Sequence, residues 1–136
     1  MSTIRFELAR IVISEINNQQ VIYLREVGGS REFPIVVGIF EATSIDRRVK
    51  QSSTPRPLTH DLIINLVELF GGQIQDVYIH TLEGETYFAS LRISTSNEIK
   101  ELDIRPSDAV AIAVSCQPHL PIMIEERVIE RVVKQV

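Results

Sequence analysis

The feature that most constrains the fold is an apolar segment close to the C-terminal end. Residues 109–116 contain no charged side chain, and Pro106 stands just before them, where proline is well suited to open a helix. The helix predicted from Pro106 to Val114 is apolar nearly all round, so it has to be buried on every side. A chain of 136 residues corresponds to about one domain. The sequence therefore predicts one compact domain, residues 1–136, with this helix in its core.

Alternating and β-branched runs predict strands around the helix. The expected strands are, in order, 4–13, 21–27, 33–37, 73–82, 86–94, 98–104 and 121–124. The first two form an opening hairpin with turn residues Asn17 and Asn18 between them. The three strands from 73 to 104 form an antiparallel meander, because turn signals of hairpin length separate them.

Three further helices are expected from the spacing of apolar residues. Residues 39–50 predict a helix with Phe40, Ile45 and Val49 on one side, and a loop covers 51–56. The helix after Pro57 is predicted to end at the glycines 71–72. Its apolar face is formed by Leu62, Ile63, Leu66, Val67 and Phe70, and that of a closing helix by Val128, Ile129, Val132 and Val133. The predicted fold class is α+β, an antiparallel or mixed sheet with about four helices.

Composition excludes several classes of protein. Hydrophobic residues at 44% and charged residues at 24% lie in the globular range. The longest uncharged apolar stretches are about eight residues, whereas a membrane span needs about 20. Charged residues near the N-terminus interrupt the apolar run that a secretory signal peptide requires. These two features predict a cytoplasmic protein. A net charge of −4 disfavours the whole surface as a nucleic-acid footprint. The single Cys116 and the absence of Gly-rich phosphate loops argue against zinc, ATP and NAD chemistry.

A short motif occurs twice at predicted helix starts. Arg56-Pro57 is followed by Thr59, His60 and Asp61, and Arg105-Pro106 is followed by Ser107 and Asp108. One interpretation is structural, with Thr59 and Ser107 capping the helices. The other is that two helix starts face one cleft. Asp61 and Asp108 would then hold a divalent cation, Arg56 and Arg105 would bind phosphate, and His60 would act as general base.

Charge is unevenly distributed along the chain. Residues 46–57 carry four basic side chains against one acid, a local +3, and the basic ones are Arg47, Arg48, Lys50 and Arg56. Residues 58–104 carry two basic side chains against eight acids, a local −6. If the basic segment lies beside His60 and Asp61, it would hold phosphates. The alternative is a solvated helix face and an acidic sheet surface.

Three separated blocks resemble the bifunctional nuclease family. They are Phe-Pro-Ile-Val-Val-Gly-Ile-Phe-Glu-Ala at 33–42, Arg-Pro-Leu-Thr-His-Asp-Leu at 56–62 and Asp-Ile-Arg-Pro-Ser-Asp-Ala-Val-Ala-Ile-Ala at 103–113. The resemblance spans roughly residues 5 to 134. It implies an α+β fold, nuclease activity on DNA and RNA, and self-association, with a dimer favoured. Some relatives continue into a short helical module known from excision-repair proteins.

The resemblance adds Glu41 to the candidate residues, since it matches the first block. The leading hypothesis is a phosphodiesterase in which Asp61, Asp108 and Glu41 hold Mg²⁺ or Mn²⁺. His60, Asp61 and Asp108 are its catalytic residues. Its phosphate-binding residues are Arg56, Arg105, Arg47, Arg48 and Lys50. The alternatives are a non-enzymatic regulatory or oligomeric module, and a protein that binds small anions or nucleotides at its helix N-termini.

Overall fold

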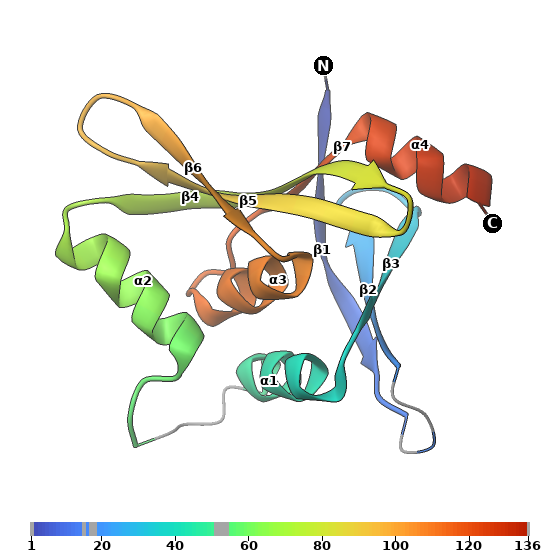
Figure 1. Ribbon diagram of the computed structural model, residues 1–136, viewed down its shortest axis with the longest axis horizontal. Coiled ribbons are helices and arrows are strands. Elements are labelled where there is room, and N and C mark those ends of the chain that lie inside the picture. The colour runs from blue at the N-terminus through green and yellow to red at the C-terminus, as the bar shows by residue number, and fades with distance from the viewer. Residues whose placement is uncertain (1, 15, 17–18, 51–54, 136) are drawn as a thin grey trace.

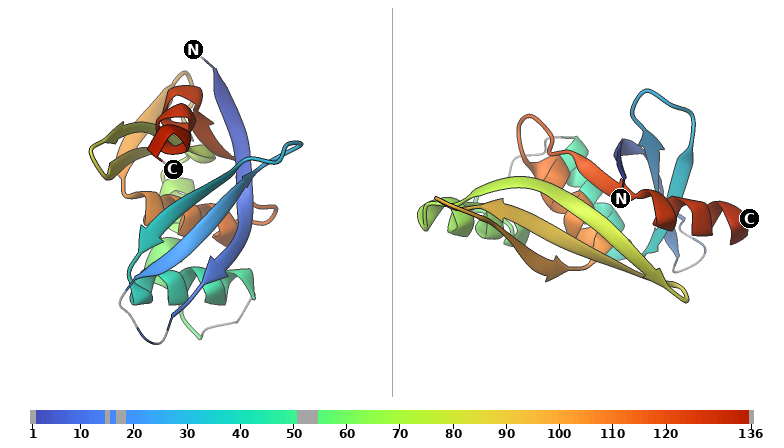
Figure 2. Two further views of the ribbon diagram at one scale, coloured as in Figure 1. Left: turned by 90° about the vertical axis from the view of Figure 1, so that its right-hand side faces the viewer. Right: turned by 90° about the horizontal axis from the view of Figure 1, so that it is seen from above.

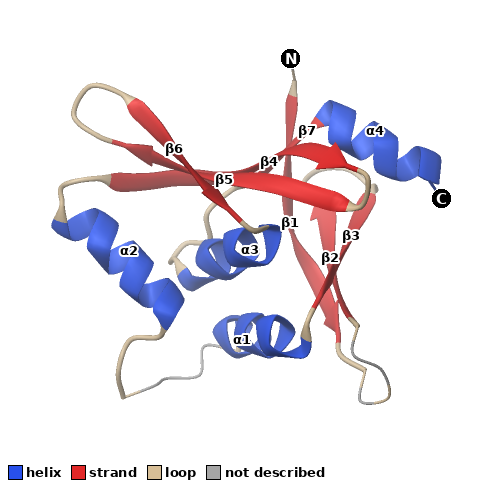
Figure 3. Ribbon diagram, in the orientation of Figure 1, coloured by secondary structure: helices blue, strands red, loops and turns tan. Residues whose placement is uncertain are grey.

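The protein is an α+β sheet structure in this computed structural model, which describes residues 2–14, 16, 19–50 and 55–135. The expected turn at Asn17 and Asn18 and the loop at 51–54 lie outside these residues. The elements, shown in Figures 1 and 3, are β1 (Thr3–Val12), β2 (Gln20–Glu26), β3 (Glu32–Val37), α1 (Ile39–Val49), α2 (Thr59–Leu69), β4 (Gln73–Glu83), β5 (Thr86–Ser94), β6 (Ile99–Ile104), α3 (Pro106–Ser115), β7 (Ile122–Glu125) and α4 (Glu126–Gln135). Every strand and helix that the sequence predicts is present in this order.

The sheet joins two antiparallel meanders through a short central strand. Its order is β3-β2-β1-β7-β4-β5-β6, and β7 pairs antiparallel with β1 and parallel with β4. Ile122 and Ile124 of β7 are almost completely buried, and helices α3 and α4 both pack against this strand. The sheet is strongly twisted, so that β1 to β3 run across the direction of β4 to β6 (Figure 2).

Helix α3 is the centre of the core. Residues 109–114 are all buried, as the apolar sequence requires. Alternating alanines let the sheet and two helices approach its backbone closely, and α3 packs against α1, α2 and strands of both meanders. Helices α1, α2 and α3 lie together on one side of β4 to β6, whereas α4 lies beside β7 on the other (Figure 1).

The predicted apolar faces of α1 and α2 are partly wrong. Phe40 is 86% exposed, since it lies about 140° around the helix from Ile45, the residue that packs inward. In α2 the inward side is formed by Ile63, Ile64 and Val67. Its outer stripe is exposed and consists of Leu62, Leu66, Leu69 and Phe70. The helix contacts only α3 and β4 appreciably, so a single face suffices to hold it.

Three residues of the predicted apolar face of the closing helix are buried, namely Val128, Ile129 and Val132, and α4 packs on β4 and β7. The side chain of Val133, the fourth, lies outside what the structure describes. Within the described ranges, no helix combines the length and apolarity needed to cross a membrane.

Candidate functional site

Three helices begin around one pocket of about 310 Å³. Its lining residues are Phe40, Glu41 and Ser44 of α1, Thr59 and His60 of α2, and Arg105, Ser107, Asp108 and Ala111 at the start of α3. A helix N-terminus presents unpaired N–H groups and the positive end of its dipole. One interpretation of the repeated motif is that two helix starts face one cleft, and in the structure the start of α1 lines the same pocket. The pocket is therefore suited to an anion.

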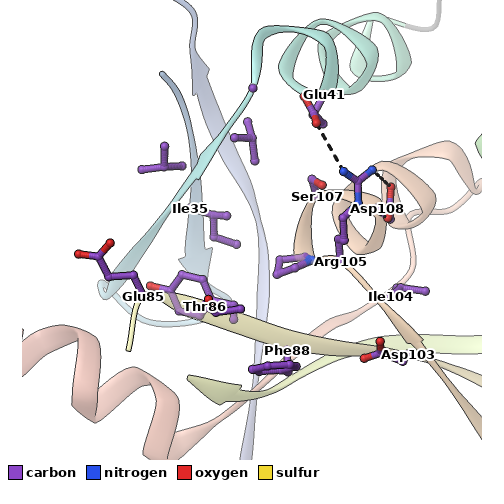
Figure 4. Close-up of a pocket in the computed structure, with 15 residues that line it drawn as sticks. Ile35, Glu41, Glu85, Thr86, Phe88, Asp103, Ile104, Arg105, Ser107 and Asp108 are labelled. Atoms are coloured by element: carbon purple, nitrogen blue, oxygen red, sulfur yellow. Dashed lines mark hydrogen bonds and ion pairs between the residues drawn. The ribbon is translucent and has the colours of Figure 1, made fainter. Parts of the chain in front are cut away.

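Asp108 is the centre of a polar network in this pocket. His60 Nε2 lies 3.3 Å from Asp108 Oδ1. Arg105 donates to both carboxylate oxygens, from Nε to Oδ2 at 2.9 Å and from Nη2 to Oδ1 at 3.0 Å. Arg105 Nη1 also lies 3.6 Å from Glu41 Oε1, and Figure 4 shows the guanidinium between the two carboxylates. The fork geometry fixes Arg105 although 67% of its side chain is exposed.

This network keeps Asp108 ionised. Burial alone would raise the pKa of Asp108, but hydrogen bonds from Arg105 and His60 outweigh that effect and hold the pKa below its usual value. The same pairing raises the pKa of Arg105. The pocket thus holds the carboxylates of Asp108 and Glu41, the guanidinium of Arg105 between them, and His60 beside Asp108.

The contact of the Asp108 carboxylate with Nε2 of His60 determines whether the other ring nitrogen, Nδ1, donates or accepts a hydrogen bond. If Nε2 carries the proton toward Asp108, Nδ1 is left as the acceptor of the ring. A neutral histidine held in this way is suited to take a proton from water. The arrangement therefore provides a candidate base and a positioned cation in one pocket.

The second acid of the repeated motif points elsewhere. Asp61 Oδ1 accepts a hydrogen bond from Arg48 Nη1, and Oδ2 accepts one from the Leu58 backbone N–H at 3.0 Å. Burial by itself would raise the pKa of Asp61, yet these two donors lower it. Asp61 faces a different pocket, which it shares with Arg56. Asp61 and Arg56 are therefore separated from Asp108 and Arg105.

Spacing explains why the two motifs differ in structure. Asp61 and Asp108 both occupy the third position of their helices, where an acid complements the helix dipole. Arg105 is the N-cap residue of α3, three positions before its acid, whereas Arg56 stands five positions before Asp61. Only the shorter spacing forms the forked pair. Thr59 and Ser107 lie inside their helices rather than at the N-cap, and neither helix has a side-chain hydrogen bond from its N-cap residue.

Comparison with known proteins identifies the family. A family profile described as "Bifunctional nuclease domain" matches residues 22–136. The chain belongs to the bifunctional nuclease domain family. The resemblance seen in the sequence is thereby confirmed.

The chain is similar to a mycobacterial protein and to plant proteins named bifunctional nucleases. It is 38% identical over 119 residues to a protein of Mycobacterium tuberculosis that is called uncharacterized, covering 88% of this chain and 70% of that protein. It is 26% identical over 109 residues to bifunctional nuclease 2 of Arabidopsis thaliana, covering 78% of this chain and 32% of the plant protein. The match to bifunctional nuclease 1 of Oryza sativa subsp. japonica is 26% over 127 residues, covering 82% and 38%. The chain thus spans about a third of the plant proteins.

The basic segment of this bifunctional nuclease domain is largely paired with acids. Arg48 contacts Asp61, and Lys50 Nζ lies 3.0 Å from Asp46 Oδ2. The segment therefore does lie beside the His60-Asp61 motif, as one interpretation of the sequence requires. Arg47 is exposed, and Arg56 lies in the Asp61 pocket. Little positive charge remains for a long nucleic-acid strand on this side.

The predicted cation ligands do not form a cation site in this arrangement. Among the described residues, no group of three His, Cys, Asp or Glu side chains is placed to hold a metal ion. Asp61 is occupied by Arg48, and both Asp108 and Glu41 face Arg105. An ion would have to displace arginine from these carboxylates, so the residues as placed do not fit one.

Some residues of the pocket were not identified from the sequence. Phe40 and Ser44 line it from the first two turns of α1. Phe40 stands two residues after Gly38, close to the predicted helix start, and this position is a signal that could have indicated it. No local signal marks Ser44, because its place depends on how α1 packs against α3.

Proposed function

We propose that the chain hydrolyses phosphodiester bonds in DNA and RNA, with the pocket at the starts of α1, α2 and α3 as its active site. The observation that carries this proposal is the contact of His60 with Asp108, whose carboxylate also holds Arg105, in a pocket formed by three helix N-termini. Membership of the bifunctional nuclease domain family supports the substrate class.

The proposed reaction uses only side chains of this pocket. The substrate phosphate binds between Arg105 and the helix N-termini, which compensate its negative charge. His60 Nδ1 takes a proton from the attacking water as the water oxygen bonds to phosphorus. The ester P–O bond on the opposite side breaks, and the leaving oxygen receives a proton from solvent. Asp108 stabilises the imidazolium that forms, as a carboxylate does beside a catalytic histidine.

In this proposal Asp61 and Arg48 are structural, and Glu41 positions Arg105. Dependence on Mg²⁺ or Mn²⁺ stays a prediction, and no step above requires it. Self-association as a dimer also stays a prediction, which light scattering of the purified protein would test.

Cleavage assays with matched histidine variants test the proposal. Single-stranded DNA, duplex DNA and RNA are incubated with wild type, His60→Ala and His80→Ala, each with Mg²⁺, Mn²⁺ or EDTA. His80 is a suitable control because it lies on β4, bonded to Thr81, and not in the pocket. We expect His60→Ala to lose about 100-fold or more in rate, within the usual contribution of a general base, and His80→Ala to match wild type.

Two results would overturn the proposal. One is undiminished cleavage by folded His60→Ala, which would point to a contaminant or another site. The other is no cleavage by wild type under any condition. If phosphate then stabilised the protein in a saturable way without turnover, the anion-binding alternative would be favoured.

A further inference from the structure

A second, larger groove opens directly from the proposed active site. Its volume is about 670 Å³, within the range of pockets that bind small molecules. It shares Glu41, Arg105, Ser107 and Asp108 with the active-site pocket. From there it extends between the end of β3 and the β5 and β6 strands, as Figure 4 shows. Anything bound to Arg105 therefore has this groove as its neighbouring space.

The wall of the groove is apolar and aromatic. Phe88 is 36% exposed and Val36 is 58% exposed, so both offer surface to a ligand. Tyr87 also lines the groove, and its ring is held against Phe33 with centroids 5.2 Å apart. Aromatic faces of this kind bind nucleobases by stacking, without regard to sequence.

The charge of the groove limits how much of a nucleic acid it can hold. Arg105 is the single cation among its lining residues, and the neighbouring Asp108 and Glu41 already compensate it. Glu85 and Asp103 line the part farther from Glu41, and no ion pair involves either of them within the described chain. A second phosphate in this part would meet two carboxylates and no cation. The groove therefore suits one uncharged nucleoside joined to one phosphate at Arg105.

We propose that the groove holds the terminal nucleoside of a single strand, so that the enzyme removes nucleotides from strand ends. This inference rests on the proposed nuclease function. Water adds to the phosphorus held at Arg105, and the P–O bond from this phosphorus to the next nucleoside of the strand, outside the groove, breaks. The proton lost by water is returned to the leaving oxygen through solvent. The products are one mononucleotide and a strand shortened by one nucleotide. Duplex DNA is a poor substrate, since a paired base would bring the phosphates of its partner strand toward Glu85 and Asp103.

The test compares a linear single-stranded DNA with a covalently closed circle of the same sequence. We expect the linear strand to be degraded to mononucleotides and the circle to stay intact over the same time. Cleavage of the circle at a comparable rate would overturn the strand-end proposal and leave the nuclease function standing. If neither DNA were cleaved, both proposals would fail.

Variants of the groove test its charge and its aromatic wall separately. The double variant Glu85→Gln/Asp103→Asn should cleave the circle measurably, which lowers the linear-to-circular rate ratio. The control Glu83→Gln/Glu130→Gln changes the net charge equally at exposed positions outside the groove and should keep the wild-type ratio. Phe88→Ala should raise KM for the linear strand about tenfold, the effect of losing one stacked base, with little change in kcat. An unchanged ratio in the groove double variant would contradict the proposal.

Discussion

Asp61→Ala provides the sharpest test of the structural role assigned to Asp61. The substitution removes the partner of Arg48, whose side chain is only 11% exposed. It also removes the acceptor for the Leu58 N–H at the start of α2. In the described structure Arg48 Nε and Nη2 are already buried without a hydrogen-bond partner. The variant would therefore leave an almost buried guanidinium with no compensating charge.

The expected cost follows from these two losses. Loss of a helix cap costs about 1 kcal/mol. Removing one partner of a fully buried ion pair costs about 3–5 kcal/mol. Since 27% of the Asp61 side chain is exposed, about 2 kcal/mol is the appropriate figure for the pair here. The sum is about 3 kcal/mol, which for a chain of this size corresponds to a decrease in Tm of about 12 °C.

Urea denaturation of four proteins measures this directly. They are wild type, Asp61→Ala, Arg48→Met, and the double variant. Because an apolar pair can replace an ion pair at little cost, the double variant should recover about 2 kcal/mol relative to Asp61→Ala alone. A loss below about 1 kcal/mol in Asp61→Ala, or no recovery in the double variant, would refute the reasoning. Folded Asp61→Ala should keep its cleavage rate; loss of cleavage with full stability would instead assign Asp61 to catalysis.

Four further predictions concern the active-site network and the core. Arg105→Ala should weaken stabilisation by inorganic phosphate in a thermal shift assay and cost at most about 1 kcal/mol of stability, because the side chain is largely exposed. Burial alone would raise the pKa of Asp108, but the hydrogen bonds that its carboxylate accepts lower the pKa in the folded protein. Ionised Asp108 therefore contributes its full stabilisation above the unfolded pKa near 3.8, and this stabilisation is lost as the pH falls through the lower folded pKa. In acid denaturation, the Asp108→Asn variant should lack this pH-dependent loss of stability. Gly38→Ala should displace the Glu41 carboxylate, since an added Cβ lies 2.6 Å from Glu41 Oε2, and should lower kcat/KM while Tm changes little. Ile112→Ala in α3 should cost about 2–5 kcal/mol in urea denaturation, as it leaves a cavity in the core.

The elements of the fold could be predicted from the sequence because each has a local signal. The turn residues between β4, β5 and β6 and the apolar periodicity of α4 are contained in short windows. The place of β7 could not be predicted in the same way. Its pairing with β1 and β4 joins residues more than 40 positions apart in the sequence, and nothing within four residues specifies the partners. The exposed side of α2 was missed for a related reason, since the helix carries two adjacent apolar stripes.

The geometry of the candidate site follows from the sequence only where the spacing is short. Arg105 and Asp108 are three positions apart on one helix start, so their contact follows from local geometry. The contact between His60 and Asp108 joins residues 48 positions apart and depends on the packing of α2 against α3. The partner of Asp61 was missed because Arg48 reaches it from α1. Because the two motifs are similar in sequence, Asp61 and Asp108 were assigned the same role. In the structure they differ, since Asp61 contacts Arg48 of α1, whereas Asp108 contacts Arg105 at the start of its own helix.

The network explains how a chain with a net charge of −4 could bind a phosphate. Asp108 and Glu41 hold Arg105 in one place but also offset its charge, so the arginine contributes mainly orientation. Most of the attraction must then come from the N–H groups at three helix starts, whose partial charges displace few of the counterions condensed on a nucleic-acid strand. Binding of single strands should therefore depend weakly on salt, with a slope of log K against log salt no steeper than about −0.7, the value for one neutralised phosphate. A much steeper slope would mean that the strand contacts several cations, which neither the Arg105 pocket nor the adjoining groove provides.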